Sequence, residues 1–276
     1  MKTVTLLKTS LLSALVLGSL SANAHRAWIA PDVTVLSGST PAVTFDMAVS
    51  NSLFNFDHVP MRANGLTIIG PDNNTVTAEN LHTGKFRTVF DLTMEKEGTY
   101  RVFIANQGLF ARWEDADGKR QYYPKRGETY DQKEFNKIVP KKAKGLEISQ
   151  TSRRLETFVT SGEPTDNALE ITKKGLELKP ITHPNDLYAG ETAKFQFFID
   201  GKPAKGVEVS IVREGTRYRN NPEEINLVSD KKGEISVNWN GAGRYFLEAS
   251  YKDNVAKKPA TVRTGGYSLV LEVLAD

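Results

Sequence analysis

Short segments of alternating apolar and polar residues, separated by turns, constrain the fold of this 276-residue chain most strongly. A two-residue period places apolar side chains on one face of a strand. Turn-forming runs such as Ser37-Gly38-Ser39 and Gly70-Pro71-Asp72 separate the segments. In the first half we expect strands at residues 28–30, 42–48, 66–69, 86–92, 100–105 and 109–113. Their spacing predicts an N-terminal β-sandwich over residues 25–125.

The last hundred residues alternate more regularly. Strands are expected at residues 193–199, 207–212, 234–239, 244–251 and 268–274. Turns such as Asp200-Gly201-Lys202 and Asn240-Gly241-Ala242-Gly243 lie between them. The pattern predicts a second sandwich over residues 181–276, immunoglobulin-like or transthyretin-like in type.

Residues 126–180 differ from both flanking regions. Phe135, Ile138 and Val139 have i, i+3, i+4 spacing, which predicts a short helix at 130–139, before Pro140. A further strand is expected at residues 152–160. The predicted fold class is therefore all-β, with two β-sandwich domains (immunoglobulin/transthyretin-like) and a short helical connecting segment.

The first 24 residues have the pattern of a secretory signal peptide. Lys2 and Lys8 precede an apolar stretch at 11–20, and Ala22-Asn23-Ala24 forms a small-residue cleavage site. Cleavage would make His25 the first residue of the mature chain. No other apolar run approaches the ~20 residues of a membrane span. We expect a soluble periplasmic protein.

Composition excludes several kinds of partner and site. Without Lys2 and Lys8, 34 of the 36 basic residues remain against 33 acidic ones, so no excess charge favours nucleic acid. Cysteine is absent, so disulfides and thiolate metal ligands are excluded. Any metal here would be held by nitrogen and oxygen ligands.

An amino-terminal histidine offers two nitrogen donors, its α-amine and the imidazole Nδ1, to one divalent transition metal. The α-amine has a pKa of about 7.7–8.0, so a metal can displace its proton near neutral pH. We expect His25 to be one ligand. His58 is the best second ligand, with Asp57 beside it to orient or bind, and Phe54-Asn55-Phe56 to exclude water.

Other candidates have simpler interpretations. Asp46 is a further possible oxygen ligand. His82 lies in a predicted turn, and His183 precedes Pro184 at the predicted interdomain junction. The arginine-rich loop at 213–219 either binds a carboxylate-bearing ligand or, as we favour, forms interdomain salt bridges.

Several motifs carry a resemblance to a known family. They are Ala24-His25-Arg26-Ala27-Trp28-Ile29-Ala30-Pro31, Phe54-Asn55-Phe56-Asp57-His58-Val59-Pro60, Thr182-His183-Pro184-Asn185-Asp186-Leu187, Asp200-Gly201-Lys202-Pro203 and Gly243-Arg244-Tyr245-Phe246-Leu247-Glu248-Ala249. Across the mature chain they resemble exported proteins classed as periplasmic components of cobalt/nickel ABC-type transport. The resemblance implies a two-sandwich protein that binds a divalent metal through His25. Arg26 stands where other members have an acidic residue.

These observations support three hypotheses. The first is a periplasmic protein that binds nickel, cobalt or copper and supports metal uptake, with a membrane transporter as partner. The second is a metal-independent module that binds a transporter or outer-membrane receptor. The third is a copper-dependent polysaccharide oxygenase, which also exposes an amino-terminal histidine. Because the usual hydrolase, nucleotide-binding and His-Glu-x-x-His motifs are absent, we do not expect an enzyme.

Overall fold

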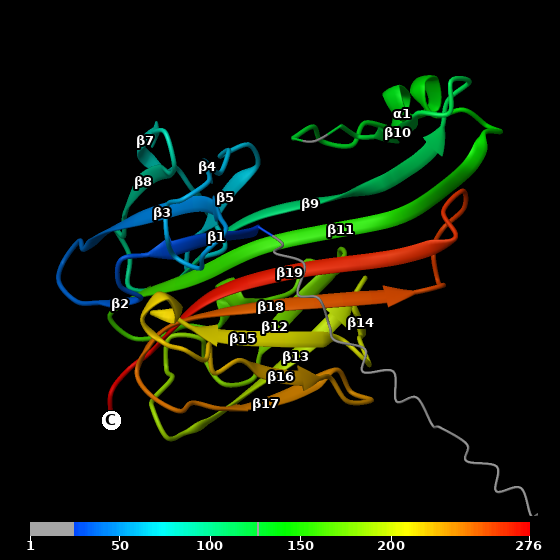
Figure 1. The fold of residues 1–276 in the computed structure, drawn as a ribbon. Helices are drawn as coiled ribbons and strands as arrows, with labels where there is room; N and C mark the ends of the chain where they lie inside the picture. The colour runs from blue at the N-terminus through cyan, green and yellow to red at the C-terminus, as the bar shows by residue number, and fades with distance from the viewer. Residues whose placement is uncertain (1–24, 126) are drawn as a thin grey trace, which may run out of the picture.

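The computed structural model describes residues 25–125 and 127–276, which form three β-sheets (Figure 1). The predicted signal peptide at 1–24 lies outside these residues. The all-β, β-sandwich fold class is confirmed. No helix in the described part of the chain is long and apolar enough to cross a membrane.

The N-terminal sheet packs its apolar face on a second, longer sheet. Phe45 and Phe90 stack on each other within this core, which also contains Val102, Leu155 and Val159 of the longer sheet. The N-terminal sheet consists of β1 (Arg26–Pro31), β3 (Ala42–Ser50), β4 (Val59–Pro60), β7 (Glu79–Thr83) and β8 (Thr88–Thr93).

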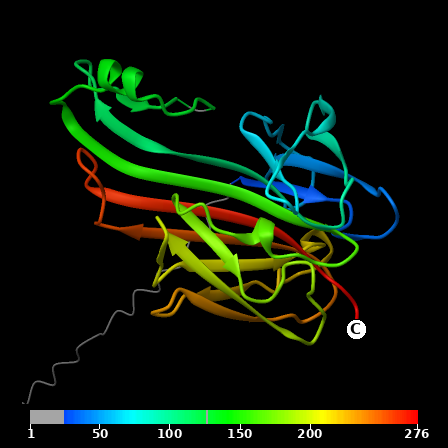
Figure 2. The same cartoon turned by 180° about the vertical axis from the view of Figure 1, so that it is seen from behind.

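The longer sheet is continuous from one sandwich to the other. Its strand β11 (Lys144–Ser161) pairs antiparallel with β9 (Gly98–Glu114) on one side and parallel with β19 (Val262–Val273) on the other. The remaining strands are β2 (Val35–Leu36), β5 (Leu66–Ile69), β6 (Thr75–Val76), β10 (Arg120–Tyr123), β15 (Glu208–Arg213), β16 (Ile225–Val228) and β18 (Gly243–Asp253). Figure 2 shows β9 and β11 from behind, extending past both sandwiches.

A third sheet covers the opposite face of the longer sheet. Phe195, Phe197 and Trp239 are fully buried between these two sheets, against Leu247 and Tyr267. This sheet consists of β12 (Leu176–Pro180), β13 (Thr192–Ile199), β14 (Lys202–Pro203) and β17 (Glu234–Asn238).

Residues 126–180 contain more than a connection. The predicted helix is present as α1 (Gln132–Ile138), capped by Asp131, whose carboxylate accepts the backbone N–H of Lys133 and Glu134. The predicted strand at 152–160 is the end of β11, and β12 belongs to the third sheet. The sheet pairing therefore runs through the segment that was expected to join the two sandwiches.

The far end of β9 and β11 projects as an arm that carries β10 and α1. Phe135 and Val139 of α1 pack with Ala111 and Tyr123. Tyr130 folds over Gly108, where an added Cβ would lie 2.3 Å from the Tyr130 ring. Only glycine allows the arm to fold this closely onto β9.

A buried ion cluster lies at the centre of the longer sheet. Glu156 accepts hydrogen bonds from Arg101 Nε at 2.8 Å and from Tyr267, while Arg154 binds Glu177 at 3.1 Å. All four charged side chains are at most 4% exposed. Two arginines balance two glutamates, which is the condition under which buried charges are tolerated.

We predict that Glu156→Gln lowers the free energy of unfolding by about 3–5 kcal/mol, because it leaves a buried arginine charge without its partner. Urea denaturation measures the change. Glu147→Gln is the matched control, since the Glu147–Arg112 pair is more than half exposed on both sides and contributes little. Equal effects of the two substitutions would show that the buried cluster does not stabilise the sheet.

Candidate functional site

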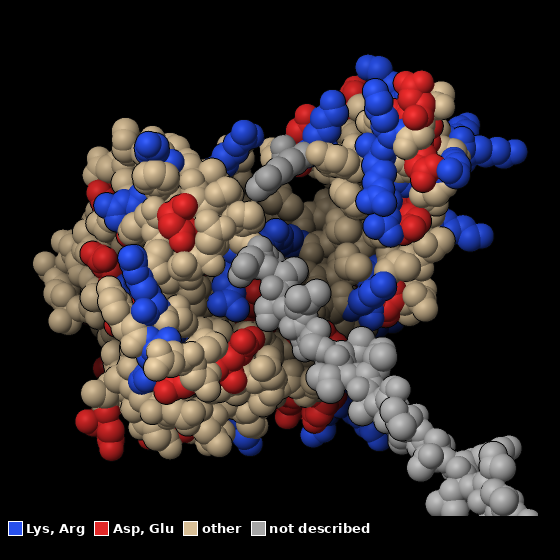
Figure 3. Space-filling model, viewed as in Figure 1, with Lys and Arg blue, Asp and Glu red and all other residues tan. Residues whose placement is uncertain are grey.

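The longer sheet leaves part of one face uncovered, and this face forms the floor of a trough. Two adjoining cavities of about 1070 and 1400 Å³ make up the trough. Both are lined by His25, Asn106, Glu128, Thr129 and Arg153. The trough lies between the N-terminal sandwich and the arm, where Figure 3 shows the surface hollowed.

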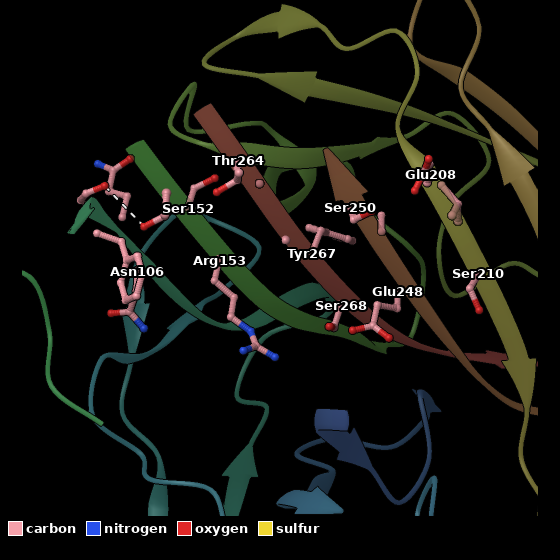
Figure 4. A pocket seen from close by; sticks show the side chains of 18 of the residues that line it. Asn106, Ser152, Arg153, Glu208, Ser210, Glu248, Ser250, Thr264, Tyr267 and Ser268 are labelled. Atoms are coloured by element: carbon pink, nitrogen blue, oxygen red, sulfur yellow. Dashed lines mark hydrogen bonds between the residues drawn. The ribbon is translucent and has the colours of Figure 1, made fainter. Parts of the chain in front are cut away.

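A row of polar and small residues crosses the trough floor. Strand register places Arg153 of β11 between Asn106 of β9 and Gly266 of β19. The row continues through Ser250 of β18 to Glu208 of β15. Because directly paired residues share a face of the sheet, these side chains point to the same side. Figure 4 shows Arg153 extending over the floor on the side where Ser268 and Glu248 lie.

His25 stands at the wall of the trough and contacts His58. Their rings stack with centroids 4.0 Å apart and planes 24° from parallel. His25 immediately precedes β1, and His58 immediately precedes β4, which pairs with β3 beside it. The structure thus brings together the two histidines that the sequence suggested as ligands.

The stacked arrangement is not itself a coordination geometry. Imidazole nitrogen lone pairs lie in the ring plane, so two nearly parallel rings cannot both direct a nitrogen at one nearby ion. One ring must turn out of the stack to bind jointly. Within residues 25–125 and 127–276, no three histidine or carboxylate side chains gather in a way that could hold a metal ion. A complete site would need a further donor, such as the α-amine that the predicted cleavage before His25 would create.

Asp57 holds the loop that carries His58. Its carboxylate accepts the backbone N–H of Asn51 at 2.8 Å and of Ser52 at 3.1 Å. Slight burial raises the pKa of Asp57, but these donors outweigh it and bring the pKa below its usual value. The carboxylate therefore orients His58 through the backbone, and both its oxygens are already engaged.

The aromatic loop beside His58 packs into a junction between the sheets. Phe54 and Phe56 lie 5.4 and 5.5 Å from the Trp28 ring. Trp28 in turn packs against Phe246 and Val270 of the longer sheet. This apolar junction fixes β1, and with it the position of His25, against the edge of the trough.

Asp46 faces a separate set of charges. Burial raises the pKa of Asp46, and Arg87, with Nη1 3.3 Å from its carboxylate, opposes that shift. Arg87 also lies over the Phe56 ring at 4.6 Å. Asp46 lines neither cavity of the trough.

The remaining histidines lie away from the trough. His82 is exposed on the edge strand β7. His183 is partly buried and bridges two segments, with Nε2 3.0 Å from Thr99 Oγ1 and Nδ1 accepting the Asn185 N–H at 3.2 Å. Burial lowers the pKa of His183, against opposing effects from the Thr165 backbone, Asp166 and Asp186.

The arginine-rich loop at 213–219 is closed by contacts within itself. Arg219 donates to the carbonyl oxygens of Arg213 and Glu214 at 2.7 and 2.6 Å. Arg213 pairs with Glu223 at 3.3 Å. These contacts stay within one hairpin, so the expected interdomain salt bridges from this loop are not seen among the described residues.

Sequence inspection missed Arg153, Asn106 and Glu248 as trough residues. Arg153 and Arg154 are adjacent in β11 and point to opposite faces, one exposed and one buried in the ion cluster. Their positions became apparent only through the pairing of β11 with β9 and β19. A charged residue inside a predicted strand was the one available signal.

One known protein family matches most of the chain. Residues 22–253 match the family described as "Domain of unknown function (DUF4198)". The chain belongs to this family. The match starts just before His25 and includes the trough-lining residues of β9, β11, β15 and β18. No curated protein matches the sequence of this DUF4198 chain.

Likenesses between the DUF4198 chain and solved structures are weak. The D0–D1 domain of intimin has 10% identity and a TM-score of 0.22, over 89% of this chain and 97% of intimin's. A DUF3823 family protein from Bacteroides uniformis has 13% identity and a TM-score of 0.24, over 79% and 92%. Escherichia coli alpha-2-macroglobulin has 11% identity and a TM-score of 0.20, over 88% and 20%. TM-scores this low assign no function.

We predict that His183 makes stability depend on pH. Its pKa is lower in the folded chain than in the unfolded chain, so the unfolded state takes up a proton first on acidification. The contribution of neutral His183 to the free energy of unfolding is fully present above its pKa in the unfolded chain, about 6.5. This contribution is lost as the pH falls toward the lower pKa of the folded chain.

Urea denaturation between pH 5 and 8 should show a shallower pH slope for His183→Gln than for the wild-type chain. His82→Gln is the control, because His82 is exposed and should leave the slope unchanged. An identical slope in wild type and His183→Gln would refute the assignment.

Proposed function

We propose that the chain, once cleaved before His25, binds a divalent transition metal at its new amino terminus and delivers it for uptake from the periplasm. The contact between His25 and His58 carries the proposal. Although 33 positions separate them in the sequence, their rings stack at 4.0 Å in the wall of a large cavity. This contact supports the proposal, because a rotation of one ring would let both imidazoles direct a nitrogen at the same ion.

Three nitrogen donors would then be available. They are the α-amine of His25, its Nδ1, and one ring nitrogen of His58. Turning one ring out of the stack breaks no hydrogen bond to a described residue, because neither ring has one in residues 25–125 and 127–276. Neutral imidazole and amine nitrogens suit copper, nickel and cobalt, with Cu(II) bound most strongly in the usual affinity order.

The cargo and the partner follow from the sequence resemblance. Resemblance to periplasmic components of cobalt/nickel transport favours nickel or cobalt as the cargo and a membrane transporter as the acceptor. The exposed position of His25 at the trough wall leaves the ion accessible for transfer. In this account the metal is cargo, and the chain catalyses no reaction.

Metal titration of the mature chain tests the proposal, with the amino terminus confirmed by intact mass. Calorimetry would compare Cu(II), Ni(II), Co(II) and Zn(II) binding to wild type, His25→Ala, His58→Gln and a form that retains Ala24. We expect wild type to bind one ion, and each altered form to bind at least about tenfold more weakly, because each lacks one nitrogen donor. His82→Gln should bind as wild type does.

Equal weak binding by all these proteins would overturn the metal assignment. The metal-independent module that contacts a transporter or receptor would then be the better account. Retention of tight binding in the form with Ala24 would show that the α-amine takes no part.

A further inference from the structure

The trough is much larger than a metal ion requires. One of the two cavities lined by His25 has a volume of about 1070 Å³, at the upper end of the range for small-molecule pockets, about 300–1,000 Å³. A bare ion at His25 would leave nearly all of this volume to water. The polar floor next to it therefore suits an organic ligand that accompanies the ion.

Arg153 is the cation on that floor. Its side chain is exposed in the trough, and it forms no ion pair or hydrogen bond with any residue of 25–125 or 127–276. Neighbouring Gly266 leaves space beside it, because an added Cβ there would lie 3.9 Å from Arg153 Cγ. An arginine in this position presents a planar fork of donors suited to a carboxylate.

Charges of both signs lie around the trough, and most of the carboxylates have other partners. Arg26 lies 3.9 Å from Glu248, which compensates one cation. Arg153, by contrast, forms no ion pair with any carboxylate in the described part of the trough. Glu208 stands at the far end of the polar row, three strands and about 14 Å away.

Acidic groups on the arm side of the trough are already engaged. Asp131 caps α1, and Glu134 lies 3.7 Å from Lys137. Glu128 accepts the backbone N–H of Lys125 at 3.1 Å. None of these groups forms an ion pair with Arg153 among the described residues, so its guanidinium donors stay available to a ligand carboxylate.

We propose that the trough binds the metal as an anionic chelate, with a carboxylate of the organic ligand on Arg153 and the ion on the His25 nitrogens. The hydroxyl groups of Ser250 and Ser268 line the same floor and can donate to further ligand oxygens. The metal part rests on the function proposed above. The carboxylate part rests on Arg153 and is tested without metal.

Citrate serves as the probe in three titrations of the mature chain: Ni(II) alone, citrate alone after removal of metal with EDTA and dialysis, and preformed 1:1 Ni(II)–citrate. We expect Arg153→Gln to weaken citrate and Ni(II)–citrate binding by roughly 10- to 100-fold, the range for a charged hydrogen-bonded pair. Binding of Ni(II) alone should not change. Arg153→Lys should recover only part of the loss, because lysine lacks the bidentate fork.

Two matched substitutions separate charge at this site from general effects. Arg120→Gln removes an exposed arginine of the arm and should leave all three titrations unchanged. Glu248→Gln removes the carboxylate beside Arg26 and should tighten citrate binding. Circular dichroism and thermal unfolding check that each variant folds.

The outcomes distinguish the two proposals. If His25→Ala abolishes Ni(II) binding while Arg153→Gln binds Ni(II)–citrate as wild type does, the ion is carried without an anchored chelator and this inference fails. If Ni(II) alone binds nowhere but citrate binding depends on Arg153, the trough is an anion site and the metal function fails. Citrate binding by neither wild type nor variants overturns the inference directly.

Discussion

Pairing of β11 with β9 on one side and β19 on the other is the constraint on which the rest of the structure depends. It makes one sheet serve two cores, so the N-terminal sandwich and the C-terminal sandwich share a wall. The buried cluster of Arg101, Arg154, Glu156 and Glu177 lies on that wall. Backbone pairing on both sides of β11, together with balanced buried charge, holds the floor of the trough in place.

The trough exists because β9 and β11 are longer than the sheets that cover them. The N-terminal sheet covers one end of their face, while the arm bearing α1 folds over Gly108 at the other. Trp28 anchors β1 at the edge of the uncovered stretch. His25 therefore stands at the trough wall as a consequence of packing, close to the exposed cation Arg153.

Periodicity was enough to predict the strands that bury one apolar face, the all-β class and the helix α1. It failed where polar side chains face the trough. Residues 106–108 interrupt the apolar alternation, so β9 was predicted as two strands, although it runs unbroken from Gly98 to Glu114. The sequence does not show which of the adjacent residues Arg153 and Arg154 is buried. Only the sheet register assigns Arg154 to the ion cluster and Arg153 to the trough. That His25 and His58 act together was a hypothesis drawn from their ligand chemistry. Pairing of β1 and β4 with β3 brings these two residues into contact.

Determination of the structure of the mature chain, beginning at His25 and loaded with one equivalent of Cu(II), tests the central claim most directly. The account predicts an ion bound by the α-amine and Nδ1 of His25 and by a ring nitrogen of His58, with one imidazole turned out of the present stack. An ion bound elsewhere, or two rings still stacked at 4.0 Å with no ion between their nitrogens and the amine, would contradict it.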